Sequence, residues 1–215
     1  MKITKYGHAC LLVEDGEARI LIDPGMWNPV PDATGVDAVL ITHEHQDHAD
    51  VGQLQQILER NPNASVITHE DVGEKVLKPA GIPYAPIEEG GRIDIKGVAV
   101  ESFGHDHAII YGDTPPCRNT GYLIGGKLFV TGDALHDVPS KPVEFLALPT
   151  GGPWMKIAEA IDYAKQVKPR IAFPVHDAMH TEQYQRGLIP SIAANYLGSE
   201  GREFRDLPAG EGLEL

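Results

Sequence analysis

The sequence predicts a layered α/β fold, with stacked sheets inside and helices on the outside. Strand-like runs divided by turns fill the first forty residues and the stretch 92–131, and helical patterns occur singly between strands. Residues 38–42 form a continuous apolar run of the kind that is buried on both faces of a sheet. No linker, low-complexity tract or repeat divides the 215 residues, so we expect one domain, 1–215, that can bury a core without disulfides.

The first half alternates between strands and helices. The expected strands are 9–14, 19–22, 38–42 and 66–68. Asp15-Gly16 is a hairpin turn signal between the first two. Apolar spacing predicts a helix over 50–60, which Asp50 can cap, and a second over 71–80, which ends before Gly81 and Pro83.

From residue 92 the pattern turns to strands again, with glycine pairs supplying turns. The expected strands are 92–95, 98–103, 120–124, 127–131, 144–148 and 170–175. Apolar residues at helical spacing predict further helices over 155–167 and 181–197.

Composition argues against several classes of protein. A formal net charge of −13 argues against nucleic acid as a partner, because nucleic-acid binders usually carry a basic face. No apolar run approaches the roughly 18 residues that span a bilayer, and the N-terminus lacks a secretory pattern. We therefore expect a cytoplasmic protein without a membrane partner. Cys10 and Cys117 lie far apart and are expected to be free thiols.

Ten histidines stand out in the composition, and three of them fall in the run from Thr42 to His48. This run starts where a buried strand ends and finishes just before a helix cap. His43 and His45, two residues apart, can point the same way in extended chain, while Asp47 and His48 can turn towards a neighbouring point. Imidazole and carboxylate together suit zinc, iron, manganese or nickel. The run therefore predicts a metal site.

Three later residues of ligand type also follow directly after expected strands. His105 comes after 98–103, Asp133 after 127–131, and His176 after 170–175. Glycine or proline next to each permits a sharp turn. These side chains can converge with the histidine run if the carboxyl ends of the strands lie at one edge of the fold.

The HxHxDH run, followed by a later His, a Gly-Asp and a final His, resembles the metallo-β-lactamase superfamily over residues 43–176. The resemblance implies an α/β (α+β) fold, a four-layer αββα sandwich with two metal ions at the shared edge of two sheets. The ligands it implies are His43, His45 and His105 on one metal, Asp47, His48 and His176 on the second, and Asp133 between the two.

Two further stretches, Gly7-His8-Ala9-Cys10 and 148–155, resemble the branch of small cytoplasmic hydrolases that includes ascorbate-6-phosphate lactonase. The resemblance implies a metal-dependent hydrolase of a small ester-like bond: a lactone, another carboxylic ester or amide, or a phosphodiester. Two divalent ions would activate water, with zinc first and manganese, nickel or iron as alternatives. With only one metal bound, Asp47 would be the catalytic residue that orients or deprotonates the water.

Two other functions stay open at this point. One is a mononuclear-iron oxidoreductase like the sulfur dioxygenases of the same superfamily, which use fewer ligands. A weaker alternative is a non-catalytic metal-binding protein.

Some residues have less definite assignments. Position after the strand favours His105 over His107 as a ligand, and His107 would then be a pocket-wall group. The other candidates for substrate contact are His8, Asn119 and His136. We expect the loops 24–36 and 104–119 to decide substrate choice. The expected partner is a small-molecule substrate, and homo-oligomerisation is left open.

Overall fold

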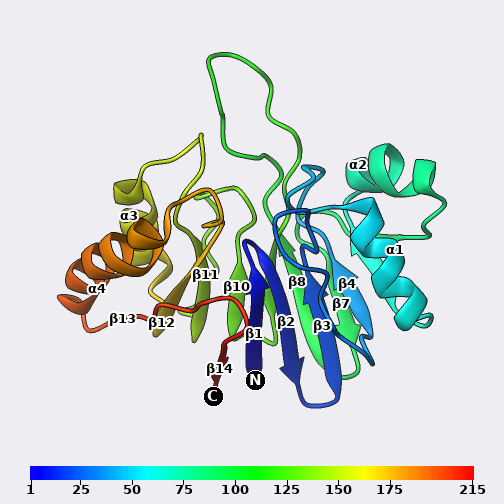
Figure 1. Cartoon of the computed structure of the whole chain (residues 1–215), viewed down its shortest axis with the longest axis horizontal. Coiled ribbons are helices and arrows are strands. Elements are labelled where there is room, and N and C mark those ends of the chain that lie inside the picture. Colours follow the sequence, from blue (N-terminus) through cyan, green and yellow to red (C-terminus); the bar gives the residue numbers. More distant parts are fainter.

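Two seven-stranded sheets pack face to face, and helices cover both outer faces, in a computed structural model that describes all 215 residues (Figure 1). The first sheet has the order β14 (Gly212–Glu214), β1 (Lys2–Gly7), β2 (Cys10–Asp15), β3 (Ala18–Ile22), β4 (Ala38–Leu40), β5 (Ser65–Thr68) and β6 (Ala85–Pro86). The second has the order β13 (Glu203–Phe204), β12 (Ile171–Val175), β11 (Phe145–Pro149), β10 (Leu128–Val130), β9 (Gly121–Ile124), β8 (Val98–Phe103) and β7 (Arg92–Ile95).

The helices lie close to the predicted ranges. They are α1 (Val51–Arg60), α2 (Glu70–Val72) with its π-helical and 3-10 continuations η1 (Gly73–Leu77) and η2 (Lys78–Ala80), α3 (Ile157–Val167), and α4 (Ile189–Gly198) after the π-helical turn η3 (Tyr184–Leu188). Asp50 caps α1, because its carboxylate accepts a hydrogen bond from the Gln53 amide. Gly81 ends the second helical segment in a left-handed conformation with φ 70°. No helix in the structure combines the length and apolar character that crossing a membrane requires.

Three separate apolar clusters make the fold four layers thick. One lies between the sheets and includes Ile20, Leu40 and Phe173. A second packs the first sheet against α1 and the following helical segment, and a third packs the second sheet against α3 and α4. The layer order is therefore helices, sheet, sheet, helices. This arrangement confirms the predicted αββα sandwich.

Strand directions bring the predicted site residues to one edge. β1, β3 and β4 run the same way in the first sheet, because β1 and β3 both pair antiparallel with β2, and β3 pairs parallel with β4. In the second sheet β8, β10 and β12 share one direction by the same reasoning. The segments after these strands carry most of the side chains that form the site.

A buried ion pair ties the two sheets together beside this edge. Lys5 of β1 donates through Nζ to the Asp177 carboxylate at 2.7 Å and to the Pro174 carbonyl at 2.8 Å. Both charged side chains are buried. Burial lowers the pKa of Lys5, and the adjacent Asp177 carboxylate counteracts this effect. The pair therefore fixes the position of β1 relative to the end of β12.

Replacing Lys5 by methionine should leave the buried Asp177 carboxylate without its close partner, since Arg186 lies 3.9 Å from it. We expect urea unfolding to show a loss of about 3 kcal/mol in the free energy of unfolding. Lys2→Met, at an exposed position of the same strand, should change it by less than about 0.5 kcal/mol. Adding Asp177→Leu to Lys5→Met should recover most of the loss. A double variant no more stable than the single one would contradict this account.

Candidate metal centre

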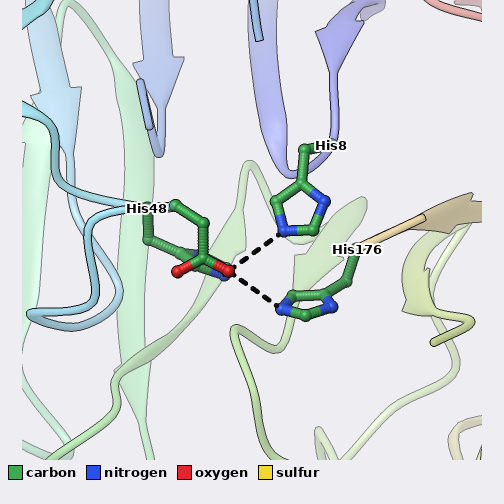
Figure 2. A group of neighbouring side chains, drawn as sticks. His8, His48 and His176 are labelled. Atoms are coloured by element: carbon green, nitrogen blue, oxygen red, sulfur yellow. Dashed lines mark hydrogen bonds and ion pairs between the residues drawn. The ribbon is translucent and has the colours of Figure 1, made fainter. Parts of the chain in front are cut away.

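Six histidines and two aspartates gather at the shared edge in two groups, each with ligand atoms within 4.8 Å of one another. The first group is His43, His45, His107 and Asp133, and the second is His8, Asp47, His48 and His176. Figure 2 shows His8, His48 and His176 of the second group turned towards a common point from different parts of the chain. Nitrogen and oxygen donors in this combination are those that zinc and related divalent metals take in proteins.

Tight backbone geometry sets the positions of these side chains. The loop between β4 and α1 packs so closely on Gly25 that a Cβ at that glycine would lie 1.8 Å from the Asp47 carbonyl oxygen. His8, Asp23 and His176 take left-handed φ angles of 32°, 46° and 54°, which side chains other than glycine rarely adopt. Such strain persists only where the surrounding structure fixes it, and it is typical of functional sites.

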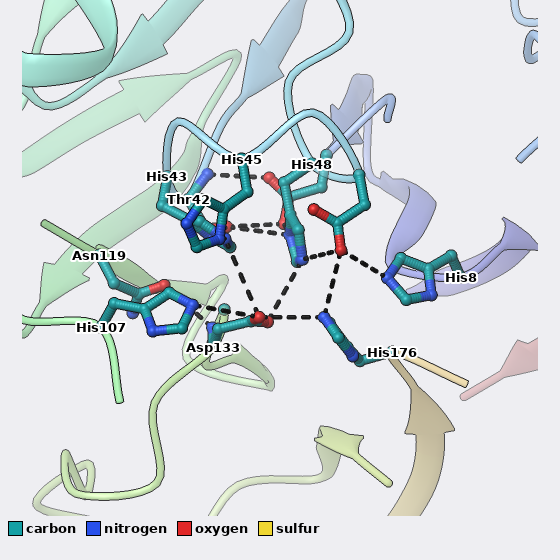
Figure 3. A network of polar contacts seen from close by, with 12 residues as sticks. His8, Thr42, His43, His45, His48, His107, Asn119, Asp133 and His176 are labelled. Atoms are coloured by element: carbon teal, nitrogen blue, oxygen red, sulfur yellow. Dashed lines mark hydrogen bonds and ion pairs between the residues drawn. The ribbon is translucent and has the colours of Figure 1, made fainter. Parts of the chain in front are cut away.

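Asp133, a member of the first group, also faces the second group (Figure 3). Its Oδ1 is 3.3 Å from His48 Nε2, and its Oδ2 is 2.9 Å from His176 Nε2 and 3.3 Å from His107 Nε2. Trp154 donates through its indole Nε1 to Asp133 Oδ2 at 3.1 Å. The carboxylate therefore faces both groups at once, as the family resemblance implied for a bridging ligand.

The histidine tautomers fit a metal centre. Acceptors hold Nδ1 of His48 (Asp23 carboxylate, 2.8 Å), of His107 (Ala108 carbonyl, 2.6 Å) and of His176 (Gly151 carbonyl, 2.6 Å). In the neutral form of each ring the hydrogen lies on Nδ1, so Nε2 offers its lone pair to a metal ion. These three Nε2 atoms, together with Asp133 Oδ1, are buried without a hydrogen-bond partner. Buried polar atoms are rarely left in this state, and metal ions bound at the two groups would satisfy all four.

The electrostatics of the cluster favour positive charge at its centre. Burial alone would lower the pKa of His48 and His176, but the nearby carboxylates raise the pKa of His48 well above its usual value and that of His176 to about 9. Burial would conversely raise the pKa of Asp47 and Asp133, yet the surrounding imidazoles lower both. Divalent cations are the natural occupants of such a field.

His8 has the opposite tautomer. The Ala178 amide donates to its Nδ1 at 3.2 Å, so the hydrogen of the neutral ring lies on Nε2, which faces Asp47 Oδ2 at 3.3 Å. Burial lowers the pKa of His8 to about 4, which keeps the ring neutral. In this arrangement His8 orients Asp47. It is not among the residues that line the cavity above the centre, and its expected contact with a substrate stays a prediction.

The structure replaces His105 with His107. His105 is 55% exposed, hydrogen-bonds Asp106 and belongs to neither group, whereas His107 is buried in the first. The reason lies in the backbone. Gly104 turns the chain with φ 76°, and the amide of His107 then pairs with the Cys117 carbonyl across the loop. The side chain that reaches the centre therefore comes two residues later in the chain than its predicted position directly after the strand.

Two other residues expected to contact the substrate also lie outside the lining of this cavity. His136 is half exposed and lies 3.1 Å from Asp137, outside the cavity. Asn119 is buried and structural: its side-chain oxygen accepts from the Asp133 amide, and its Nδ2 donates to the Thr131 carbonyl. Asp23 is a functional residue outside the predicted set, although it follows directly after β3 and so has the same position relative to a strand as the predicted ligands.

A family model described as a beta-lactamase superfamily domain matches residues 2–176. The chain belongs to this superfamily.

Individual relatives agree with this family. A Mycobacterium tuberculosis protein is 38% identical, over 83% of this chain and 85% of its own. A UPF0173 metal-dependent hydrolase of Carboxydothermus hydrogenoformans is 32% identical, over 82% of this chain and 84% of its own. The solved structure of a metallo hydrolase from Ignicoccus hospitalis shares the fold, with a TM-score of 0.75, 23% identity, and 100% and 98% of the two chains covered. The protein is a metal-dependent hydrolase of the metallo-β-lactamase fold.

Metal content will distinguish His107 from His105. Because His107 belongs to the first group, His107→Ala should weaken metal binding by at least the 10- to 100-fold typical of losing an outer hydrogen bond. His105→Ala should bind metal like the natural protein. Metal per chain after dialysis and chelator competition measure both. Weaker metal binding in His105→Ala, with metal binding of His107→Ala unchanged, would contradict the assignment of His107 as the ligand.

The Asp23 carboxylate should increase the metal affinity of the second group. Asp23→Asn leaves fewer acceptor oxygens for His48 Nδ1, Thr42 Oγ1 and the Thr42 amide, which the carboxylate now holds. We expect metal affinity to fall about 10- to 100-fold in chelator competition while the fold is kept. The matched control is Asp37→Asn. Asp37 lies at the opposite end of β4, where its carboxylate accepts a hydrogen bond from the Arg19 amide. Equal effects of both substitutions would refute the role of Asp23.

Proposed function

We propose that the protein activates water at a two-metal centre and hydrolyses a small ester-like bond: a lactone, another carboxylic ester or amide, or a phosphodiester. The buried, unpartnered Nε2 atoms around Asp133 carry this proposal. They are donors of the right type, held in the right tautomer, and they face two adjacent points on either side of one carboxylate.

Each group would hold one ion. His43, His45 and His107 would bind the first, Asp47, His48 and His176 the second, and Asp133 would lie between them. Divalent ions bound there supply a water of near-neutral pKa and polarise the oxygen of the scissile bond. Zinc is the first candidate because the donors are imidazole and carboxylate, with manganese, nickel and iron as alternatives.

Asp47 is the residue of the centre best placed to handle a proton. It lines the cavity, and its side chain is 15% exposed, whereas that of Asp133 is 3% exposed. Its Oδ2 lies 3.4 Å from His176 Nε2 and 3.3 Å from His8 Nε2. The His8 ring holds the carboxylate in this orientation. If no ion is bound at the second group, the Asp47 carboxylate can accept a proton from water in the cavity.

The complete second group supports the hydrolase over a mononuclear-iron oxidoreductase. A single ion would need only His43, His45 and His107, yet Asp47, His48 and His176 converge as closely as the first group does. We therefore take two-metal hydrolysis as the function.

The purified protein should contain two equivalents of a divalent metal per chain. It should also hydrolyse at least one member of a panel of lactones, thioesters, carboxylic esters and phosphodiesters. His43→Ala should reduce that activity by about a hundredfold or more, because the metal supplies several kcal/mol of transition-state stabilisation. His105→Ala, an exposed histidine outside the centre, serves as the control.

Other outcomes would contradict the proposal in different ways. One equivalent of iron, with oxygen uptake and no hydrolysis, would indicate the oxidoreductase instead. A protein that binds no metal would contradict both enzymatic functions.

A further inference from the structure

The cavity above the metal ligands has apolar walls. It measures about 120 Å³, and its walls other than the ligands are Trp27, Ile110, Pro153, Trp154 and Met179. No lysine or arginine lines it. Trp27, Ile110 and Met179 are also 44%, 51% and 48% exposed at its mouth. Large apolar side chains that are exposed to solvent around a concave site are typical of ligand-binding sites.

A second cavity adjoins the first. It measures about 240 Å³ and shares His45, His107 and Ile110 with the first cavity. It lies along the long loop between β8 and β9, which stands out from the sandwich in Figure 1. Its other walls are Ala108, Thr114, Pro115, Pro116 and Cys117.

No nearby cation is free to bind an anionic group of the substrate. Arg118, next in sequence to Cys117, forms ion pairs with Glu88 and Asp71 and lines neither cavity. Lys75 pairs with Glu44 and Asp71. The net charge of −13 adds a repulsive field. Bound metal ions would attract the scissile group itself, but a phosphate elsewhere on the substrate would lose its hydration without gaining a partner.

We propose that the substrate is a neutral molecule whose scissile bond lies over the metals and whose hydrocarbon part occupies the second cavity. Substrates that carry a phosphate group away from the scissile bond are excluded by the same walls. This inference rests on the proposed function and assigns its substrate class. Ile110, which lines both cavities, is the specificity-determining residue where they meet.

Binding can be measured apart from turnover. Trp27 and Trp154 are the chain's two tryptophans, and both line the first cavity, so intrinsic tryptophan fluorescence reports its occupancy. The probes are δ-valerolactams that carry a methyl, propyl, pentyl or phosphorylated hydroxymethyl group at carbon 6, titrated into the metal-loaded protein. Each two-carbon extension should tighten binding about 4- to 16-fold, from about two- to fourfold per buried methylene. The phosphorylated lactam should bind at least tenfold more weakly than the propyl lactam.

A matched pair of variants tests the position. Ile110→Lys should abolish the dependence on tail length and improve binding of the phosphorylated lactam. Ile109→Lys should change neither, because the neighbouring Ile109 is 60% exposed and lines neither cavity. Metal content of both variants confirms that the centre is intact.

The outcomes separate this inference from the proposed function. Tail-dependent binding without hydrolysis of any ester-like bond would support the substrate pocket and refute the hydrolytic proposal. Hydrolysis of panel substrates, combined with binding that ignores tail length or prefers the phosphorylated lactam, would overturn the inference and leave the hydrolase in place. Equal effects of Ile109→Lys and Ile110→Lys would also overturn it.

Discussion

The Asp133 carboxylate sits buried among the imidazoles of His48, His107 and His176, and the rest of the centre depends on how this charge is held. An ionised carboxylate in a protein interior costs several kcal/mol unless cations or hydrogen bonds compensate it. Trp154 donates a hydrogen bond to Oδ2, but Oδ1 has no hydrogen-bond partner. Positive charge at the two ligand groups completes the compensation. Metal binding and folding should therefore be coupled, since the occupied centre exists only in the folded chain.

The fold supplies this centre by aligning strand ends. His43, His107, Asp133 and His176 follow strands β4, β8, β10 and β12, which lie in two different sheets. Few of these residues are neighbours in sequence, so their convergence requires that the sheets keep a fixed relative position. The Lys5–Asp177 pair and the hydrogen bond from the His176 amide to the His8 carbonyl hold that position next to the ligands. The strained backbone at His8 and His176 is the local cost of this arrangement.

Patterns along the chain predicted most elements and most ligands because each depends on short-range chemistry. The Asp50 cap and the apolar face of α1 are examples, as is the placement of ligand-type residues directly after strands. The two-residue edge strands β6 and β13 carry too little pattern to be recognised, and they form by pairing with longer neighbours. The choice of His107 over His105 depends on the backbone direction after Gly104 and on pairing with a segment ten residues away. Sequence spacing does not contain that information.

The residues that hold the metals and the residues that choose the substrate come from different parts of the fold. The motif residues hold the donors on rigid strand ends, and the structure keeps them where the family resemblance expects them, His107 excepted. The cavity walls come instead from loops: Trp27 lies in 24–36 and Ile110 in 104–119, the two loops expected to decide substrate choice. A substrate such as ascorbate 6-phosphate would need a cationic side chain to bind its phosphate. Neither cavity is lined by a lysine or an arginine. Similarity of the catalytic motifs therefore identifies the type of reaction, while the uncharged walls point to a different class of molecule.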